Sequence, residues 1–226
     1  MDLVCDPPET FLSCYNREVD SELDRIEAAL SRYGLLLEHD QELPSVTLLI
    51  AGEPIRGSWW GHRLGHAIYE LLGVFHQRSG ALSTKIVDGK VTYVHPRLWP
   101  AFMSLAQDSD PGRRQGLSPA ALELLACVER EGPLRADAAA MPRALAQAPR
   151  ELTKTIRLLE TRLLLHSDSL HTESGAHVKV LRSWPQWCQE RGVCVEAIDL
   201  AEARAELQRA LDALCAGTTR RPKVPW

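Results

Sequence analysis

Residues 149–164, PRELTKTIRLLETRLL, decide the fold. On a helical wheel of about 100° per residue, one side of this stretch is apolar, and the opposite side is basic and polar without an acidic residue. The apolar side holds Leu152, Ile156, Leu159 and Leu163, and the opposite side holds Arg150, Lys154, Arg157 and Thr161. The pattern predicts an amphipathic helix that rests its leucines on a core and presents its cations to a partner.

The sequence after this helix predicts a β-hairpin. Residues 163–184 read LLLHSDSLHTESGAHVKVLRSW, and two runs in them have the composition of strands, Leu163–His166 and His177–Arg182. Ser, Thr and Gly are common in the residues between the two runs. A hairpin in this position, directly after a helix with a basic face, is typical of the wing of a winged helix-turn-helix domain.

Two further helices are expected before the basic one. Ser118-Pro119 combines a hydroxyl cap with a proline in the first turn, so a helix begins there, and Gly132-Pro133 stops it. A shorter helix is expected around Leu134 to Ala140, followed by a turn at Pro142. Three helices and a hairpin in this order predict a winged helix-turn-helix domain over about residues 117–187.

The first half of the chain carries a second helix-and-hairpin pattern. The runs LSTKIV and KVTYVH flank Asp88-Gly89, the dipeptide favoured by a tight hairpin turn, because both turn positions need positive φ. An amphipathic helix is expected over residues 18–36 with its end near Gly34, and another from Trp59, capped by Ser58, toward Phe75. Residues 44–51 fit a strand or a helix, and a helix is expected over Pro96 to Leu105. Two related modules in tandem are therefore one interpretation.

These patterns predict an α+β fold that is mainly α-helical with small β-hairpins. We expect a helical N-terminal domain with a hairpin over residues 1–110, a winged helix-turn-helix domain over 111–190, and a C-terminal helix with a basic tail over 191–226. The boundary is placed in the polar segment 107–116, QDSDPGRRQG, which has no periodicity.

The C-terminal segment predicts an amphipathic helix and a flexible tail. Leu207, Leu211 and Leu214 form a stripe on the helix, and such a stripe has to pack on the body of the chain or on a second copy. A homodimer through this helix is therefore expected as one of the two alternatives. Arg220, Arg221 and Lys223 make the tail basic, which suits either a phosphate contact or a solubilising end.

Charge and cysteine usage limit the class of protein. The net charge is −4, but residues 1–110 hold 9 Lys and Arg against 16 Asp and Glu, and residues 111–226 hold 17 against 14. The excess of cations in the second half is compatible with a polyanion surface there. The six cysteines form no Cys-x-x-Cys pair, and neither a leader pattern nor a long apolar stretch is present. We expect a cytoplasmic protein without cofactor or membrane contact.

The basic helix and the wing supply the candidate nucleic-acid ligands. Lys and Arg contact phosphates, and Arg or Lys can also bind guanine edges in a major groove. DNA is the expected partner, although the sequence does not separate DNA from RNA, and many winged helices contact only proteins. The expected binding residues are Arg150, Lys154, Arg157, Thr161, Lys179 and Arg182.

A second candidate site lies around residues 58–66, SWWGHRLGH. Trp59, Trp60, His62 and His66 form a candidate ligand pocket, in which an indole could stack on a flat ligand or base. The alternative is that the tryptophans anchor the start of a helix. The two histidines lack the glutamate of a zinc-protease motif, and no metal site is expected. No phosphate-loop, dinucleotide or serine-hydrolase motif is present, so the sequence leaves open whether the protein is an enzyme.

Two stretches resemble known proteins. IAGEPIRGSWWGH and KIVDGKVTYVHPRLWPAF, within residues 44–106, resemble a family of uncharacterised bacterial proteins that share the G-S-W-W-G/A-H and V-x-G-K-V-T-x-V-H-x-R-L-W-P patterns, and TESGAHVKVLRSWPQW is a weaker echo. The repeated winged elements distantly resemble the tandem winged helices of the AlkZ/YcaQ-type DNA glycosylases. That resemblance implies a nucleic-acid repair or modification enzyme as the alternative to a DNA-binding protein, and a protein-interaction module is the third hypothesis.

Overall fold

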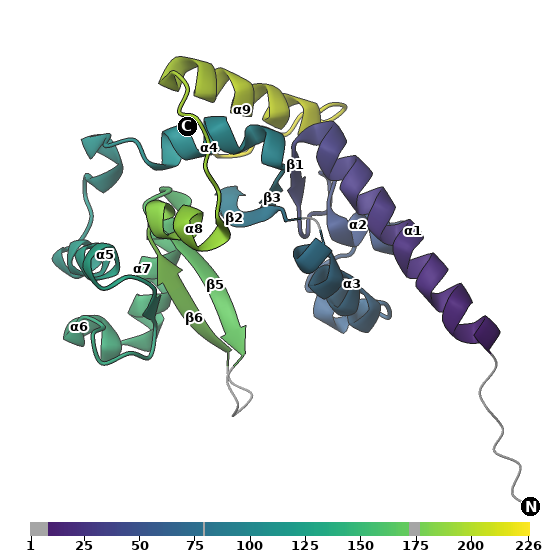
Figure 1. Cartoon of the computed structure of the whole chain (residues 1–226), viewed down its shortest axis with the longest axis horizontal. Coiled ribbons are helices and arrows are strands. Elements are labelled where there is room, and N and C mark those ends of the chain that lie inside the picture. Colours follow the sequence, from purple (N-terminus) through teal and green to yellow (C-terminus); the bar gives the residue numbers. More distant parts are fainter. Residues whose placement is uncertain (1–8, 79, 172–176) are drawn as a thin grey trace, which may run out of the picture.

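The protein is an α+β chain in which helices surround two small antiparallel sheets of three strands each (Figure 1). The computed structural model describes residues 9–78, 80–171 and 177–226. The arrangement is two lobes that meet beneath the C-terminal helix. This confirms the expected class of helices with small hairpins. None of the helices in the described part of the chain is long and apolar enough to cross a membrane.

The first module contains three main helices and one sheet. Its elements are α1 (Glu9–Tyr33), β1 (Leu35–Leu37), α2 (Val46–Ala51), the 3-10 turn η1 (Trp59–Gly61), α3 (Gly65–Arg78), β2 (Leu82–Val87) and β3 (Lys90–Val94). The last strand, β3, lies in the middle of the sheet, between β1 and β2. The hairpin turn at Asp88 and Gly89 has φ of 54° and 65°, which confirms the expected tight turn.

The helix expected from Trp59 to Phe75 is interrupted. Its first residues form η1, His62 is extended with ψ of 150°, and α3 begins only at Gly65. The chain doubles back so closely that a Cβ on Gly65 would lie 2.8 Å from the Trp60 carbonyl oxygen. The prediction of one continuous helix was therefore wrong. Residues 46–51 are helical, which settles the ambiguity of residues 44–51 in favour of a helix.

The second module repeats the same order of elements. These are α5 (Pro119–Glu131), β4 (Leu134–Arg135), α6 (Arg143–Ala146), α7 (Pro149–Thr161), β5 (His166–His171) and β6 (His177–Arg182), and β6 lies between β4 and β5. The Ser118 cap and the basic helix are confirmed. The prediction of a helix over 134–140 was wrong, because Leu134 and Arg135 pair with Leu181 and Val180 of β6. The first hairpin strand begins at His166 rather than Leu163.

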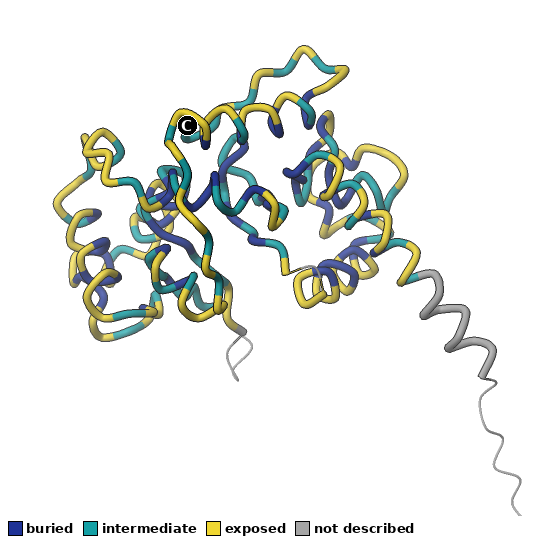
Figure 2. The backbone as a smooth tube through the Cα atoms, turned by 45° about the horizontal axis from the view of Figure 1, so that its top comes forward, coloured by how far each residue is buried: buried dark blue, intermediate teal, exposed yellow. Residues whose placement is uncertain are grey.

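One hydrophobic core joins the two modules. It contains Leu82 and Phe102 from the first half of the chain, and Trp184 and Leu207 from the second half. Figure 2 shows buried segments inside each lobe and in the region between them. The expected division into domains stays a prediction, although the segment 107–116 does include the short 3-10 helix η3 (Pro111–Arg114).

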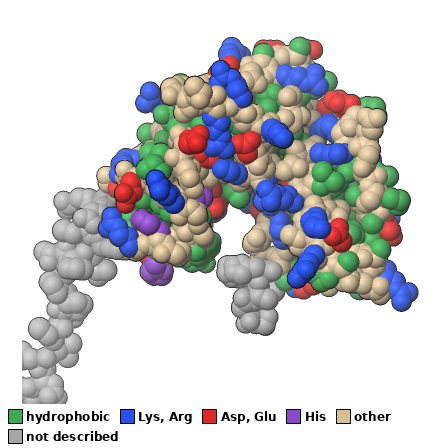
Figure 3. Space-filling view, turned by 180° about the vertical axis from the view of Figure 1, so that it is seen from behind, with side chains coloured by type: hydrophobic (Ala, Val, Ile, Leu, Met, Phe, Trp, Pro, Cys, Tyr) green, Lys and Arg blue, Asp and Glu red, His purple; other side chains and the backbone are tan. Residues whose placement is uncertain are grey.

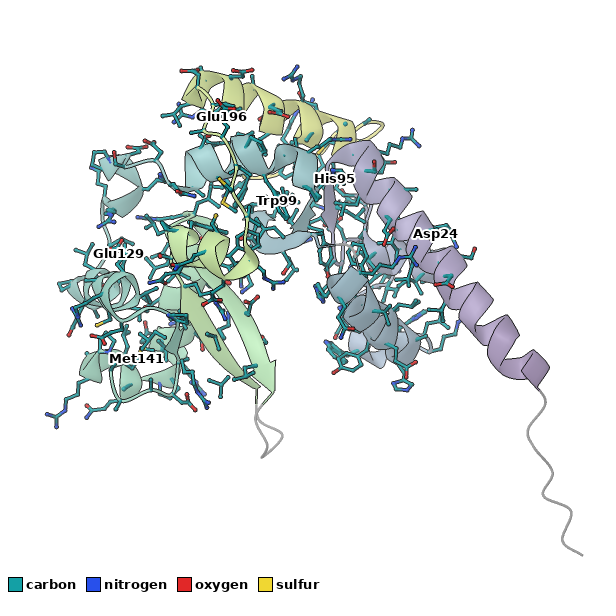
Figure 4. The ribbon with its side chains drawn as sticks, in the orientation of Figure 1. Asp24, His95, Trp99, Glu129, Met141 and Glu196 are labelled. Carbon is teal, nitrogen blue, oxygen red and sulfur yellow. The ribbon has the colours of Figure 1, made fainter. Side chains whose placement is uncertain are left out.

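Three helices and a 3-10 turn build this junction. They are η2 (Pro96–Leu98), α4 (Trp99–Ala106), α8 (Trp184–Arg191) and α9 (Leu200–Leu214). The Trp99 ring meets that of Trp187 edge-on, with centroids 5.7 Å apart, and Trp99 lies near the middle of the molecule (Figure 4). The leucine stripe of α9 is buried in its own chain, where α9 packs on α4. The leucine stripe therefore packs on the same chain, and a homodimer through α9 stays a prediction.

The basic tail is held against the first module. The Arg220 guanidinium binds Asp40 at 2.8 Å and Asp88 at 2.6 Å, and the Lys223 backbone exchanges hydrogen bonds with Asp88. Asp40 also binds Lys90 at 2.6 Å. The expectation of a flexible tail was therefore wrong, because Asp40 and Asp88 together neutralise its first arginine.

Candidate nucleic-acid interface and inter-module cleft

The outer side of α7 carries the predicted cations. Ile156 and Leu159 are buried in the core of the second module, and Arg150, Lys154 and Arg157 are exposed. The structure confirms the predicted apolar and basic sides of α7. The expectation that the basic side has no acidic neighbour needs one correction. The Glu151 carboxylate lies beside that side and binds the Lys154 ammonium at 2.7 Å.

The two ends of α7 differ in their surroundings. Near the C-terminal end of α7, Arg157 and Thr161 lie against the β2–β3 hairpin turn of the first module, since a Cβ on Gly89 would be 3.2 Å from the Thr161 methyl carbon. A groove of about 480 Å³ runs here between the hairpin turn, α7 and residues Lys223 to Pro225 of the tail. Lys154 also lines this groove, whereas Arg150, in the first turn of the helix, is exposed outside it. Figure 3 shows Lys and Arg side chains over this rear side of the molecule, with Asp and Glu among them.

The two cations predicted on the wing already have partners. Arg182 binds Asp168 at 3.0 Å and Glu190 of α8 at 2.5 Å. Lys179 donates to the Ser167 hydroxyl at 3.1 Å and lies 3.4 Å from Glu160. These partners lie 8 to 19 residues away along the chain, beyond the repeat of a helix or a strand, so no periodic pattern reveals them. Lys179 and Arg182 are therefore paired within their own chain.

The two tryptophans of the first module have different roles. Trp59 is buried, and Trp60 stacks on it with ring centroids 4.2 Å apart while 63% of its surface stays exposed. Burial raises the pKa of the Glu38 carboxyl, against the opposing effect of hydrogen bonds from Tyr93 and Trp59. Trp59 is therefore part of the core, whereas Trp60 lies exposed between Trp59 and the Tyr69 ring, whose centroid is 5.4 Å away, and ligand binding here stays a prediction.

The two histidines of the predicted pocket lie outside it. His62 accepts a hydrogen bond from the Leu64 backbone at 3.3 Å, and His66 is 84% exposed beside Glu70, 3.2 Å away. Because the helix is interrupted between them, they are not one turn apart on a common face. Among the described residues, no group of three or more His, Cys, Asp or Glu side chains could hold a metal ion.

A cleft of about 770 Å³ separates the two modules. One wall comes from η1, α3 and β2 with Trp60, His76 and Lys85, and the other comes from β5, β6 and α8. The space-filling view shows the molecule hollowed between its lobes (Figure 3). On the second wall, the residues are His166, Ser167, Asp168, Ser169, Lys179, Trp187 and Arg191. Both predicted sites thus contribute to this cleft, Trp59 and Trp60 from one module and Lys179 from the other.

A buried carboxylate organises the floor of the cleft. Glu160 of α7 exposes only 4% of its side chain, and its Oε2 binds the Lys85 ammonium at 2.6 Å. Its Oε1 accepts the Ser167 hydroxyl at 2.6 Å. Burial is the main cause that lowers the pKa of Lys179 to about 8, and the Lys85 charge acts in the same direction against Glu160.

A second polar group lies beside the floor. His166 is buried between the Trp184 and Trp187 rings, and its Nε2 lies 3.0 Å from Asp168. Burial raises the pKa of Asp168, but the hydrogen bond with His166 and the charge of Arg182 outweigh it, so the pKa stays below its ordinary value. Asp168 is therefore an anion that neutralises Arg182.

Comparisons with protein-family models, with curated proteins and with solved structures find no match to this chain. The resemblance on residues 44–106 stays a prediction. Function has to be argued from the residues and their geometry.

Proposed function

We propose that the protein binds double-stranded DNA and that its two modules are winged helix-turn-helix domains in tandem. Support for the fold comes from the order helix, strand, helix, helix, strand, strand, which occurs twice with the last strand in the centre of each sheet. In such a domain the third helix is the recognition helix and the final hairpin is the wing. In the second module these parts are α7 and the hairpin of β5 and β6.

One observation carries the proposal. The exposed side of α7, the helix in the recognition position, holds Arg150, Lys154 and Arg157, and Arg150 lies in its first turn. Recognition helices place their first turns against base edges, and cations beside them bind phosphates. The corresponding helix of the first module, α3, exposes Tyr69 and Val74 instead, so it does not share this cationic character.

Fluorescence anisotropy over a salt series tests the proposal. We expect duplex DNA to bind at low salt, and the logarithm of affinity to fall against the logarithm of salt concentration with a slope of about −3 or steeper, since each phosphate contact contributes about −0.9. Single-stranded DNA and duplex RNA are the comparison ligands. Absence of duplex binding at low salt, or binding that does not depend on salt, contradicts the proposal.

The structure bears differently on the two other hypotheses, a protein-interaction module and a repair or modification enzyme. Packing of α9 on α4 accounts for the leucine stripe that was the one support for a protein-interaction module. The hypothesis of a repair or modification enzyme retains the open indole of Trp60 in the cleft between the modules. A cleft of this kind can hold a base or nucleotide taken out of the helical stack.

A further inference from the structure

The floor of the cleft between the modules holds two amines and one carboxylate. Lys85 of β2 and Lys179 of β6 both reach Oε2 of Glu160, at 2.6 Å and 3.4 Å. Two ammonium groups share this one buried carboxylate, and the pKa of Glu38, the other acid that interacts with Lys85, is raised by burial, so positive charge is in excess here. Burial of an uncompensated charge is costly, and an amine relieves that cost by losing its proton.

The distances identify Lys179 as the amine in excess. Lys85 makes the short ion pair, whereas Lys179 has its shorter contact with the Ser167 oxygen, at 3.1 Å. The Ser167 hydroxyl donates to Glu160 Oε1, so its oxygen is an acceptor for Lys179. A neutral Lys179 keeps this hydrogen bond and retains a lone pair on Nζ. Lys179 lines the cleft.

We propose that Lys179 is a nucleophilic amine that forms an imine with an aldehyde bound in the cleft between the two modules. The inference does not depend on DNA binding by α7. A lysine beside another cation in a partly desolvated site is a recurring way to obtain a reactive amine.

The electrostatic surroundings of Lys179 agree with this role. Its pKa is lowered to about 8, so about half of the amine is neutral at pH 8. An ordinary lysine, with a pKa of about 10.4, is well under about 1% neutral at that pH. The other acidic and basic side chains that line the cleft are Glu38, Glu70, His76, His166, Asp168 and Arg191.

The reaction balances without an oxidant or a second reactant. The Nζ lone pair attacks the aldehyde carbon, the carbonyl π electrons move to oxygen, and one proton of the amine is transferred to that oxygen to give a carbinolamine. Loss of water, which takes the hydroxyl group and the remaining amine proton, leaves the imine. Amine and aldehyde therefore become imine and water.

The cleft suits an aldehyde that carries a flat ring or is flanked by one. Its volume of about 770 Å³ suits a small organic molecule, and the rings of Trp60 and Trp187 line it. Two sources supply an aldehyde of this kind, a free metabolite with an aromatic ring or the open-chain sugar of an abasic nucleotide flanked by bases. The same imine forms with either.

Reductive trapping tests the amine first. Pyridoxal 5′-phosphate is incubated with the intact protein, the imine is reduced with cyanoborohydride, and modified lysines are located by peptide mass spectrometry. We expect Lys179 to be modified at least about tenfold faster than the exposed Lys154, with a rate that rises up to pH about 8 and then levels off. Lys154 is a matched control because it also has a carboxylate partner, Glu151.

A DNA arm distinguishes the two sources of aldehyde. An oligonucleotide with one abasic site is trapped with borohydride, as duplex and as single strand, with wild type and with Lys179→Arg, which keeps a long basic side chain and removes the nucleophile. A covalent complex that the variant loses assigns the abasic sugar as the ligand. Trapping of the small aldehyde alone at Lys179 assigns a free aldehyde.

The mapping on wild type keeps the inference falsifiable even if the variant does not fold. Equal labelling of Lys179 and Lys154, or preferential labelling of Lys85, overturns the proposal. Since the small aldehyde needs no contact with α7, failure of this arm is separate from failure of DNA binding.

Discussion

Replacing Asp40 with alanine is expected to lower the free energy of unfolding by about 2–3 kcal/mol, because it removes a buried acceptor while Lys90 and Arg220 keep access to solvent. The Asp40 side chain is fully buried and accepts hydrogen bonds from Lys90, Arg220 and the backbone N–H groups of Glu42 and Leu43. Alanine leaves all four donors without this acceptor. It also frees Arg220, so the tail loses one of its two anchors on the first module.

In the wild-type protein, protonation of Asp40 at acid pH should lower the free energy of unfolding. Burial raises the pKa of Asp40, but the hydrogen bonds from Lys90 and from the Leu43 and Glu42 backbone outweigh it and lower the pKa from 3.8 to about 2. A carboxyl whose pKa is lower in the folded state than in the unfolded state stabilises the folded protein at pH values above its unfolded-state pKa. This contribution, about 2 kcal/mol, is present above pH about 4 and is lost as the pH falls toward 2.

Urea denaturation of Asp40→Ala and a control variant measures the effect. Asp137→Ala is the matched control, because Asp137 pairs with Arg135 at the surface. Its unfolding midpoint should stay close to that of wild type, since exposed ion pairs contribute little. Equal midpoints for the two variants would refute the role assigned to Asp40.

The triple variant Arg150→Glu, Lys154→Glu, Arg157→Glu is expected to weaken duplex DNA binding at least about a hundredfold at low salt. Three phosphate contacts are lost and three repulsive charges take their place. The side chains are exposed, so the fold should persist, and circular dichroism checks this. Anisotropy titration measures the affinity.

A second triple variant separates the α7 face from net charge. Arg56→Glu, Arg204→Glu and Arg209→Glu change the total charge by the same amount at exposed positions away from α7. This variant should keep an affinity within a few-fold of wild type. If both variants lose affinity equally, binding follows total charge and α7 is not the interface.

Local signals predicted much of the fold. The hairpin at Asp88-Gly89, the cap at Ser118 and the two sides of α7 depend on residues close in sequence, and the structure confirms them. Non-local features were missed or misjudged. Strand β4 has only two residues and exists because it pairs with β6, more than 40 residues later. The tail appears flexible in sequence because its anchors, Asp40 and Asp88, lie far upstream.

The candidate site was predicted only in part. Lys179 was expected as a phosphate ligand, and its placement beside Lys85 and Glu160 depends on how the modules pack. One signal was available, since Glu160 follows Ile156 by one helical turn and so lies on the apolar side of α7. A carboxylate on that side needs buried partners. The separation of Trp60 from His62 and His66 came from the interruption before Gly65, which no periodicity indicates.

Site-specific photo-crosslinking determines whether α7 is the helix that contacts DNA. A benzophenone amino acid replaces Arg150 in one protein and Arg209 of α9 in another, and each is irradiated with labelled duplex DNA. We expect a protein–DNA adduct from position 150 and none above background from position 209. Adducts from position 209 alone, or from neither position under conditions where DNA is bound, would contradict it.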